Sequence, residues 1–403
     1  MRITAIEAYT EGCAATLRAA VQPARADSAR DLWFRFEGLD GPLETSADPF
    51  AAAMLPFCMH EGEGCRIEGA LSPVLAENMK LAQDRLAGWY DFLSPVEVAA
   101  EAETPANSWD RPDDRTDGAV VCCFSGGVDS WYSLLKNAER VTHLLLVRGF
   151  DIGLDNAALW QSTRTRIAEV AAAMGLRLIV CETNLRELAD ARRADWGKPC
   201  DFDFWGQCLH GAALAAISLA LPRSFGGLIV PATHSEDQLK PWGSSPQLDP
   251  LWSNERMRIR HDGCEAGRTE KVQAISGSRL ALQSLRVCHN DLAETNCGRC
   301  EKCIRTMLAL RLSGVLEQAE TFPDTRALRR LRRLEVPAHL IHHYESLLSA
   351  ARQRGDSGLI RAIEAILGRR FSAERSLAGC VRSLRRGLRE TPGAKLAGNA
   401  QRG

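Results

Sequence analysis

The strongest constraint on the fold is an alternation of short apolar runs with amphipathic helical segments that begins at Gly118. The runs GAVVCCF, THLLLVRGF, LRLIVCETN and GGLIVPAT have the length and composition of buried strands, and helical patterns separate them. This order predicts an α/β fold in which helices sandwich a parallel sheet. Ligands of such sheets bind beyond the carboxyl ends of the strands. The loops that should meet there begin at Ser125, Arg148, Thr183 and Pro231.

Regions of different character flank this core. Residues 1–110 mix strand-like runs such as LWFRFEG with a helical pattern near SPVLAENMKLAQDRLAGWYDFL, which predicts a small α+β N-terminal domain. The polar, proline-bearing segment 101–117 is typical of a linker. We place the central domain at 118–315 and a helical, basic C-terminal extension at 316–403. A chain of 403 residues exceeds the usual size of one domain, in keeping with this division.

Composition limits the location and the partners. The chain has no stretch of eighteen or more apolar residues, and its start lacks the apolar run and cleavage site of a secretory signal. We therefore expect a cytoplasmic protein without a membrane partner, in which most of the fourteen cysteines are free thiols. Seventeen Lys and Arg against seven Asp and Glu in 321–403 allow a nucleic acid or an acidic partner. We favour the interpretation that this excess reflects solvated arginine faces of helices. Assembly into a homodimer is a separate alternative.

The segment SGGVDS, Ser125 to Ser130, lies between a predicted buried strand and the start of a helix. Its backbone amides can point together at an anion near the positive end of the helix, and phosphate fits such a site. Gly126 and Gly127 allow close approach of the backbone, while Asp129 can hold a magnesium ion or orient the loop. The segment lacks the lysine of a Walker loop. An ordinary glycine turn with a helix cap is the alternative interpretation.

SGGVDS matches every fixed position of the SGGxDS signature, and the chain therefore resembles the PP-loop ATP pyrophosphatase family. This resemblance implies an adenine nucleotide alpha-hydrolase-like fold. It also implies that ATP, with Mg²⁺, adenylates an oxygen of the substrate, that pyrophosphate leaves, and that a nucleophile then displaces AMP. By the same resemblance, VRGFD at Val147 to Asp151 contacts the adenine or the ribose, although this part of the match is loose.

A cation later in the chain is also expected to reach the phosphates. RTEKVQAI resembles the family's KxEI-like segment, but here the glutamate precedes the lysine. Solvated helix faces are the alternative for both cations of this segment. The residues that the resemblance assigns to nucleotide binding are Ser125, Gly126, Gly127, Val128, Asp129, Ser130, Arg148, Gly149, Arg268 and Lys271, and those assigned to catalysis are Ser125, Asp129, Ser130 and Lys271.

Four cysteines stand at metal-ligand spacing in VCHNDLAETNCGRCEKC: Cys288, Cys297, Cys300 and Cys303. Four thiolates at this C-x8-C-x2-C-x2-C spacing can enclose one tetrahedral Zn²⁺. A site without an open coordination position is structural and contributes to folding. An iron–sulfur cluster and a sulfur-carrying cysteine pair are the alternatives.

The early SGGVDS and the late CGRCEKC together resemble the 7-cyano-7-deazaguanine synthase (QueC) family, over roughly Gly118 to Leu310. The resemblance implies a ligase that uses ATP and ammonia to turn 7-carboxy-7-deazaguanine, or a related carboxylate, into an amide and then a nitrile. The synthase is shorter, and WGSSPQLDPLWS here replaces its YPD-type segment. Two alternatives therefore stay open for the substrate that is adenylated, a small-molecule carboxylate or a protein. Two also stay open for the nitrogen donor, ammonia or an amine. QueC-like proteins with extra domains also occur in antiviral defence, which is a further alternative.

Candidates for substrate handling lie in the long segment after the fourth strand and at the start of the preceding helix. They are Gln207, His210, His234, Asp237, Asp249 and Trp252. Packing or capping is the alternative explanation for each. Two other functions stay open: a tRNA-modifying PP-loop sulfurtransferase, and an ATP-binding subunit that does not catalyse.

Overall fold

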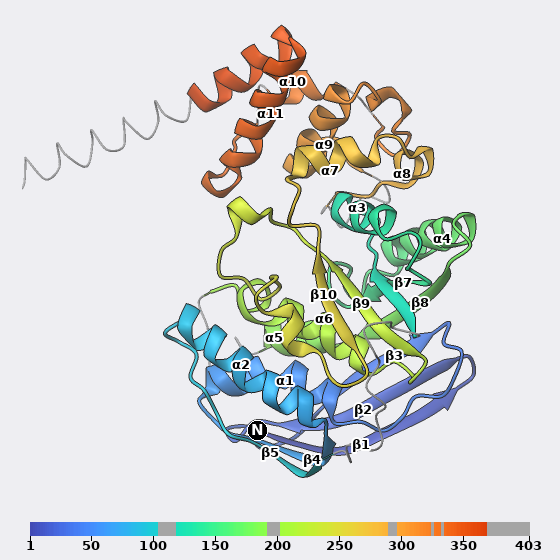
Figure 1. Ribbon diagram of the computed structural model, residues 1–403, viewed down its shortest axis with the longest axis vertical. Coiled ribbons are helices and arrows are strands. Elements are labelled where there is room, and N and C mark those ends of the chain that lie inside the picture. Colours follow the sequence, from blue (N-terminus) through green and yellow to red (C-terminus); the bar gives the residue numbers. More distant parts are fainter. Residues whose placement is uncertain (104–117, 192–201, 289–295, 324–325, 332–333, 369–403) are drawn as a thin grey trace, which may run out of the picture. The chain divides into compact units, whose positions relative to one another are not determined.

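The computed structural model describes residues 1–103, 118–191, 202–288, 296–323, 326–331 and 334–368 (Figure 1). The chain divides into two compact units, Met1–Thr325 and Arg326–Gly403. The first unit contains a mostly parallel sheet of ten strands in the order β10-β9-β6-β7-β8-β3-β2-β1-β4-β5, together with helices. The predicted α/β class is therefore confirmed.

Five parallel strands form the half of the sheet that holds the candidate site. They are β6 (Ala119–Cys123), β7 (His143–Arg148), β8 (Arg177–Thr183), β9 (Phe225–Pro231) and β10 (Arg258–Asp262). The first four are the strands that the apolar runs predict. The short, charged strand β10 escapes notice in the sequence because it pairs only with β9 and is partly exposed. All five carboxyl ends lie at one edge of the sheet, as the parallel pairing requires.

Helices cover these strands. Figure 1 shows α3 and α4 on one side of them and α5 and α6 on the other. The bounds are α3 Val128–Lys136, α4 Ala157–Ala173, α5 Leu185–Ala191 and α6 His210–Leu219, which a π-helical turn, Trp205–Leu209, precedes. Three further helices follow β10: α7 Arg268–Ile275, α8 Arg279–Ser284 and α9 Glu301–Leu312.

The N-terminal region continues the same sheet. Its elements are β1 Arg2–Glu11, β2 Ala14–Gln22, β3 Arg30–Glu37, α1 Asp48–Glu61, β4 Cys65–Leu71, α2 Pro73–Trp89 and β5 Val98–Glu103. Strand β3 runs antiparallel to β8, with Phe34 opposite Thr183 and Glu37 opposite Val180. The region predicted as a separate α+β domain thus shares one sheet and one hydrophobic core with the central domain. Residues 101–103 belong to β5 rather than to a linker, and 104–117 lie outside the described residues.

Helix α1 explains part of this joint core. Its residues from Asp48 to His60 are all buried, so its sequence lacks the amphipathic period of a surface helix. It packs against α6 of the central domain. The buried Asp48 carboxylate accepts a hydrogen bond from Ser72 N (2.9 Å) within the N-terminal region and one from Asn254 Nδ2 (2.7 Å), and the second bond connects the two regions.

The second unit is helical in its described part, as the sequence predicts. It contains α10 (Ala327–Leu331), α11 (Ile341–Arg354) and a further helix at 357–368. Most of the basic tail, 369–403, lies outside the described residues. Residues 316–323, which the sequence assigns to the extension, belong to the first unit. None of the helices in the described ranges is long and apolar enough to cross a membrane.

Candidate functional site

The SGGVDS loop follows β6, which lies between β9 and β7 in the sheet. Gly126 has φ +77°, a left-handed conformation that favours glycine, and Gly127 is the N-cap residue of α3. Among the described residues no side chain caps the first turn of α3, and Ser130 Oγ instead donates to Gly127 O (3.0 Å). The amides of this turn are therefore free to bind an anion.

Two cations from α7 hold Asp129 of this loop. Arg268 NH1 lies 2.6 Å from Asp129 Oδ2, and Lys271 Nζ lies 3.4 Å from Oδ1. Lys271 Nζ also donates to Ala232 O (2.6 Å), just after β9. Burial alone would raise the pKa of Asp129, but the charges of Arg268 and Lys271 more than offset burial and lower it. The structure thus brings together the loop and both cations of the RTEK segment.

Two buried donors near the start of α7 have no hydrogen-bond partner among the described residues: Arg268 Nε and Ser235 Oγ. A Cβ on Gly267, the N-cap of α7, would come within 4.0 Å of Ser235 Oγ, so this hydroxyl lies at the N-terminus of the helix. Helix α7 packs against α3. Buried polar groups are almost always paired, and an anion between the two helix starts would pair these donors.

Arg148 and Gly149, at the end of β7, are predicted to contact the nucleotide, but in the structure they contact protein groups. Arg148 NH1 donates to Glu182 Oε1 (2.9 Å), and its guanidinium lies 5.5 Å from the centre of the Trp160 ring. Gly149 has φ +97°, and a Cβ there would approach Thr183 O to 1.9 Å. Glycine is thus required for the close packing of the β7 and β8 ends, and Arg148 is engaged by protein groups.

Two of the substrate candidates and a residue absent from the predictions lie near one another. Asp249 is fully buried and accepts from Ser244 Oγ (2.8 Å). Its Oδ2 lies 2.7 Å from Nδ1 of His261, which was not predicted because the sequence of β10 does not resemble a strand. Burial lowers the pKa of His210, and the neighbouring Asp151 and Asp249 oppose this effect.

The other candidates are placed differently. Gln207 is half-buried in the π-helical turn before α6. Trp252 is fully buried in the hydrophobic core, so it packs rather than meets a substrate. Asp237 is exposed, and His234 is half-buried with its ring centre 6.4 Å from that of Trp242. The side chains of Ser244 and His261, neither of which was predicted, bond the Asp249 carboxylate.

The four predicted cysteines come together. All their Sγ atoms lie within 4.8 Å of one another, and the pairs Cys288–Cys300 and Cys297–Cys303 are each 3.9 Å apart. Sulfurs about 2.3 Å from a tetrahedral zinc would be about 3.8 Å apart, so the spacing fits. The amides of Arg299 and Cys300 donate to Cys297 Sγ (3.4 and 3.2 Å). Hydrogen bonding with Cys303 lowers the pKa of Cys300 to about 4 and raises that of Cys303.

The cysteine cluster is connected to the phosphate-binding candidate by a short segment. Arg286 N donates to Gly126 O (2.8 Å) in the SGGVDS loop. The amides of Val287 and Cys288 donate to the side chain of Asn296 (2.8 and 3.1 Å), which is completely buried. No local pattern singles out Asn296 in the sequence. The cluster and Asn296 together hold this segment against the loop.

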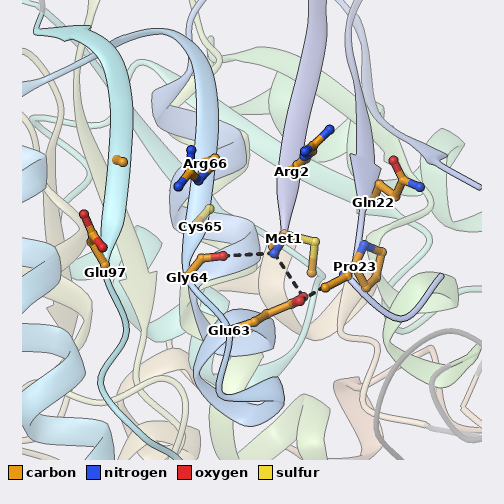
Figure 2. Close-up of a pocket in the computed structure, with 11 residues that line it drawn as sticks. Met1, Arg2, Gln22, Pro23, Glu63, Gly64, Cys65, Arg66 and Glu97 are labelled. Atoms are coloured by element: carbon orange, nitrogen blue, oxygen red, sulfur yellow. Dashed lines mark hydrogen bonds and ion pairs between the residues drawn. The ribbon is translucent and has the colours of Figure 1, made fainter.

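A second feature that the sequence did not indicate is a pocket of about 810 Å³ between the ends of β1, β2, β4 and β5 (Figure 2). The amino group of Met1 there donates to Gly64 O (2.9 Å) and pairs with Glu63 (3.2 Å). Its other lining residues are Arg2, Gln22, Pro23, Ala24, Cys65, Arg66, Glu97 and Ala99. None of these described lining residues belongs to the candidate site, so the pocket is separate from it.

No protein-family model, no curated protein and no solved structure matches the chain. The function of the site is therefore inferred from its own residues. These are the glycine-rich loop with the cations of α7, the Asp249–His261 pair, and the four-cysteine cluster.

Proposed function

We propose that the chain is a PP-loop ATP pyrophosphatase of the adenine nucleotide alpha-hydrolase type. It adenylates a carboxylate, releases pyrophosphate and passes the acyl group to ammonia or an amine, as a QueC-like carbon–nitrogen ligase does. The observation that carries this proposal is the SGGVDS loop after β6, whose Asp129 is paired with Arg268 and Lys271 of α7. The unpartnered Ser235 hydroxyl and Arg268 Nε, within the described part of the chain, support an anion at the same place.

Each group has a role in this reaction. A carboxylate oxygen of the substrate attacks the α-phosphorus, the bond to the β-phosphate breaks, and pyrophosphate leaves. The amides of the loop and the charges of Arg268 and Lys271 would stabilise the negative charge on the departing phosphates. Asp129 offers a carboxylate to Mg²⁺, which when bound neutralises phosphate oxygens. A nitrogen nucleophile then attacks the carbonyl carbon, AMP leaves, and the nitrogen loses a proton.

The four cysteines would hold a structural zinc ion in this proposal. The fit of the sulfur spacing and the two amide–sulfur bonds support a closed site with four thiolate ligands. A closed site leaves no thiol of the cluster available to carry sulfur, so it favours the ligase over the sulfurtransferase. Colourless protein with one zinc per chain would support this assignment. An iron–sulfur chromophore or a persulfide would support the sulfurtransferase instead.

The direct test is to incubate the protein with magnesium-ATP, ammonia and either 7-carboxy-7-deazaguanine or related acids. AMP and pyrophosphate are the expected products, and ADP with phosphate would refute the proposal. Asp129→Asn should abolish the release, whereas Asp84→Asn, on an exposed position of α2, is the matched control. Tight ATP binding without turnover on any acid would identify a subunit that does not catalyse.

A further inference from the structure

The pocket between the ends of β1, β2, β4 and β5 is lined by two arginines from neighbouring strands. Arg2 of β1 is paired with Arg66 of β4 on one side and with Gln22 of β2 on the other. Residues paired in this way share one face of a sheet, and Figure 2 shows the three side chains in one row across the strands. Both arginines are exposed, whereas Ile3 and Ile67, which follow them, are buried in the core. The two guanidinium groups therefore lie together on the face of the sheet that points away from the core.

These two positive charges are not compensated by the protein. Neither arginine side chain forms a hydrogen bond or an ion pair with any residue that the structure describes. The acid of β4, Glu68, instead accepts a hydrogen bond from Ala5 N (2.9 Å). Like charges opposite each other on adjacent strands destabilise a sheet. An anion held between Arg2 and Arg66 would replace this repulsion with attraction.

Hydrogen bonds hold the other polar groups of the pocket. Gln22 Nε2 donates to Ala26 O (3.1 Å), which leaves the amide oxygen of Gln22 as an acceptor. The Glu63 carboxylate accepts from Ala24 N (2.9 Å) and pairs with the amino group of Met1 (3.2 Å). The charge of Glu63 is thus compensated without the two arginines.

We propose that this pocket binds a small molecule that carries a phosphate monoester, with the phosphate held between Arg2 and Arg66. Each guanidinium offers several donors in one plane, which suits the oxygens of a phosphate group. The volume of about 810 Å³ is in the range of small-molecule sites. The amide oxygen of Gln22 and the exposed carboxylate of Glu97 can accept hydrogen bonds from hydroxyl or amino groups on the rest of the ligand. None of these residues belongs to the SGGVDS site, so the inference does not depend on the proposed function.

The acids of the pocket favour a single phosphate over a polyanion. Glu63 and Glu97 line the same space as the two arginines. A nucleic acid carries a negative charge at every nucleotide, so its neighbouring phosphates would meet these carboxylates. One phosphate group can reach Arg2 and Arg66 without this repulsion.

The test uses phenylglyoxal, which modifies accessible arginines, with the rate at each arginine followed by peptide mass spectrometry. The probes are inorganic phosphate, AMP and ribose 5-phosphate, and acetate at the same ionic strength is the control. Saturating phosphate should slow the modification of Arg2 and Arg66 together by at least about fivefold. Arg85 is the internal control, because it is exposed on α2 and its side chain has no partner among the described residues. No slowing at the arginine pair, or equal slowing at Arg85, would overturn the proposal.

The same assay distinguishes the classes of ligand. AMP or ribose 5-phosphate should protect the two arginines at a lower concentration than inorganic phosphate does, because the rest of the molecule adds contacts. Protection by a single-stranded oligonucleotide at a lower concentration than by any of the small phosphates would overturn the assignment to a small molecule. The readout comes from peptides of β1 and β4, so phosphate bound at the SGGVDS loop does not contribute to it.

Variants show whether the two arginines act as one site. Arg66→Gln should raise the concentration of phosphate that protects Arg2 by at least about fivefold, because half of the charged donors are lost. Arg85→Gln is the matched control and should leave that concentration unchanged. Because the substitution also removes a like-charge contact, the melting temperature of Arg66→Gln in phosphate-free buffer should be the same as that of the wild type or higher. A lower melting temperature with unchanged protection of Arg2 would show that Arg66 is structural and would overturn the proposal.

Discussion

Replacing Lys271 with methionine tests whether α7 supplies a cation to the phosphate loop. The Lys271 side chain is 1% exposed, and its Nζ contacts Asp129 Oδ1 (3.4 Å) and Ala232 O (2.6 Å). It also lies 5.7 Å from the centre of the Tyr132 ring. Methionine keeps most of the length and the apolar packing while removing the charge. The interaction with the phosphates and the bonds to Asp129 and Ala232 should be lost.

The expected magnitude follows from the type of contact. A hydrogen bond between a charged donor and a charged acceptor contributes about 1.5–3 kcal/mol. The dissociation constant for magnesium-ATP should therefore rise about 10- to 150-fold in Lys271→Met. Calorimetry measures this directly and does not require the acyl substrate. The unpaired Ala232 carbonyl should cost the fold about 1–3 kcal/mol, so binding can be measured well below the unfolding midpoint.

Lys136 provides the matched control. Its Nζ lies 5.9 Å from the centre of the same Tyr132 ring, but it pairs with Glu265 (2.6 Å) and Asp262 (3.1 Å) instead of Asp129. Lys136→Met should leave ATP binding within about threefold of the wild type. If both variants bind ATP as the wild type does, or if both weaken it equally, Lys271 has no specific role at the phosphates.

Three further outcomes are expected. Cys300→Ser should release the metal and lower both the melting temperature and the affinity for ATP. Metal analysis, calorimetry and a binding assay measure these three effects, and an unchanged melting temperature would exclude a structural metal. Asn254→Ala should reduce the free energy of unfolding by about 1–3 kcal/mol, because Asp48 loses a buried hydrogen-bond partner. Urea titrations measure this change, and Gln247→Ala, at an exposed position, is the control. His261 has its pKa raised to about 9 from an ordinary value of about 6.5, so its stabilisation is complete below about pH 6.5 and is lost as the pH rises through about 9. The difference in unfolding free energy between wild type and His261→Gln should thus shrink by up to about 3 kcal/mol over this range, and a constant difference would contradict the ion pair.

The parts of the site that the sequence predicts are those encoded by local spacing. SGGVDS places its glycines and its aspartate within one turn and the start of one helix, so the geometry follows from neighbouring residues. The cysteines gather because Gly298, with φ +63°, turns the chain between Cys297 and Cys300. The resemblance also singled out Arg268 and Lys271, which the packing of α7 against α3 then brings to Asp129.

The parts that escaped prediction depend on contacts between distant segments. The pairing of β3 with β8 joins residues about 150 positions apart, and no local pattern encodes it. Helix α1 has no amphipathic period because every side is buried. His261 lies in the short edge strand β10, and the charged sequence of this strand resembles that of a loop. Asn296 is a single polar residue whose role appears only when its four hydrogen bonds are seen.

The N-terminal region bears on the site through the strand that it adds beside β8. The side chain of Asn184, directly after β8, accepts from Trp33 N (3.2 Å) and donates to Asp31 O (2.8 Å) of β3. The loop that follows β8 is one of those expected to border the nucleotide, so residues 1–103 help to fix its start. Asp48 and Glu255 make a second connection, since they bond the starts of α1 and α2 to the turn before β10 that leads to His261. The region that the family resemblance leaves unexplained is therefore built into the scaffold of the candidate site from two sides, beside the end of β8 and before the start of β10.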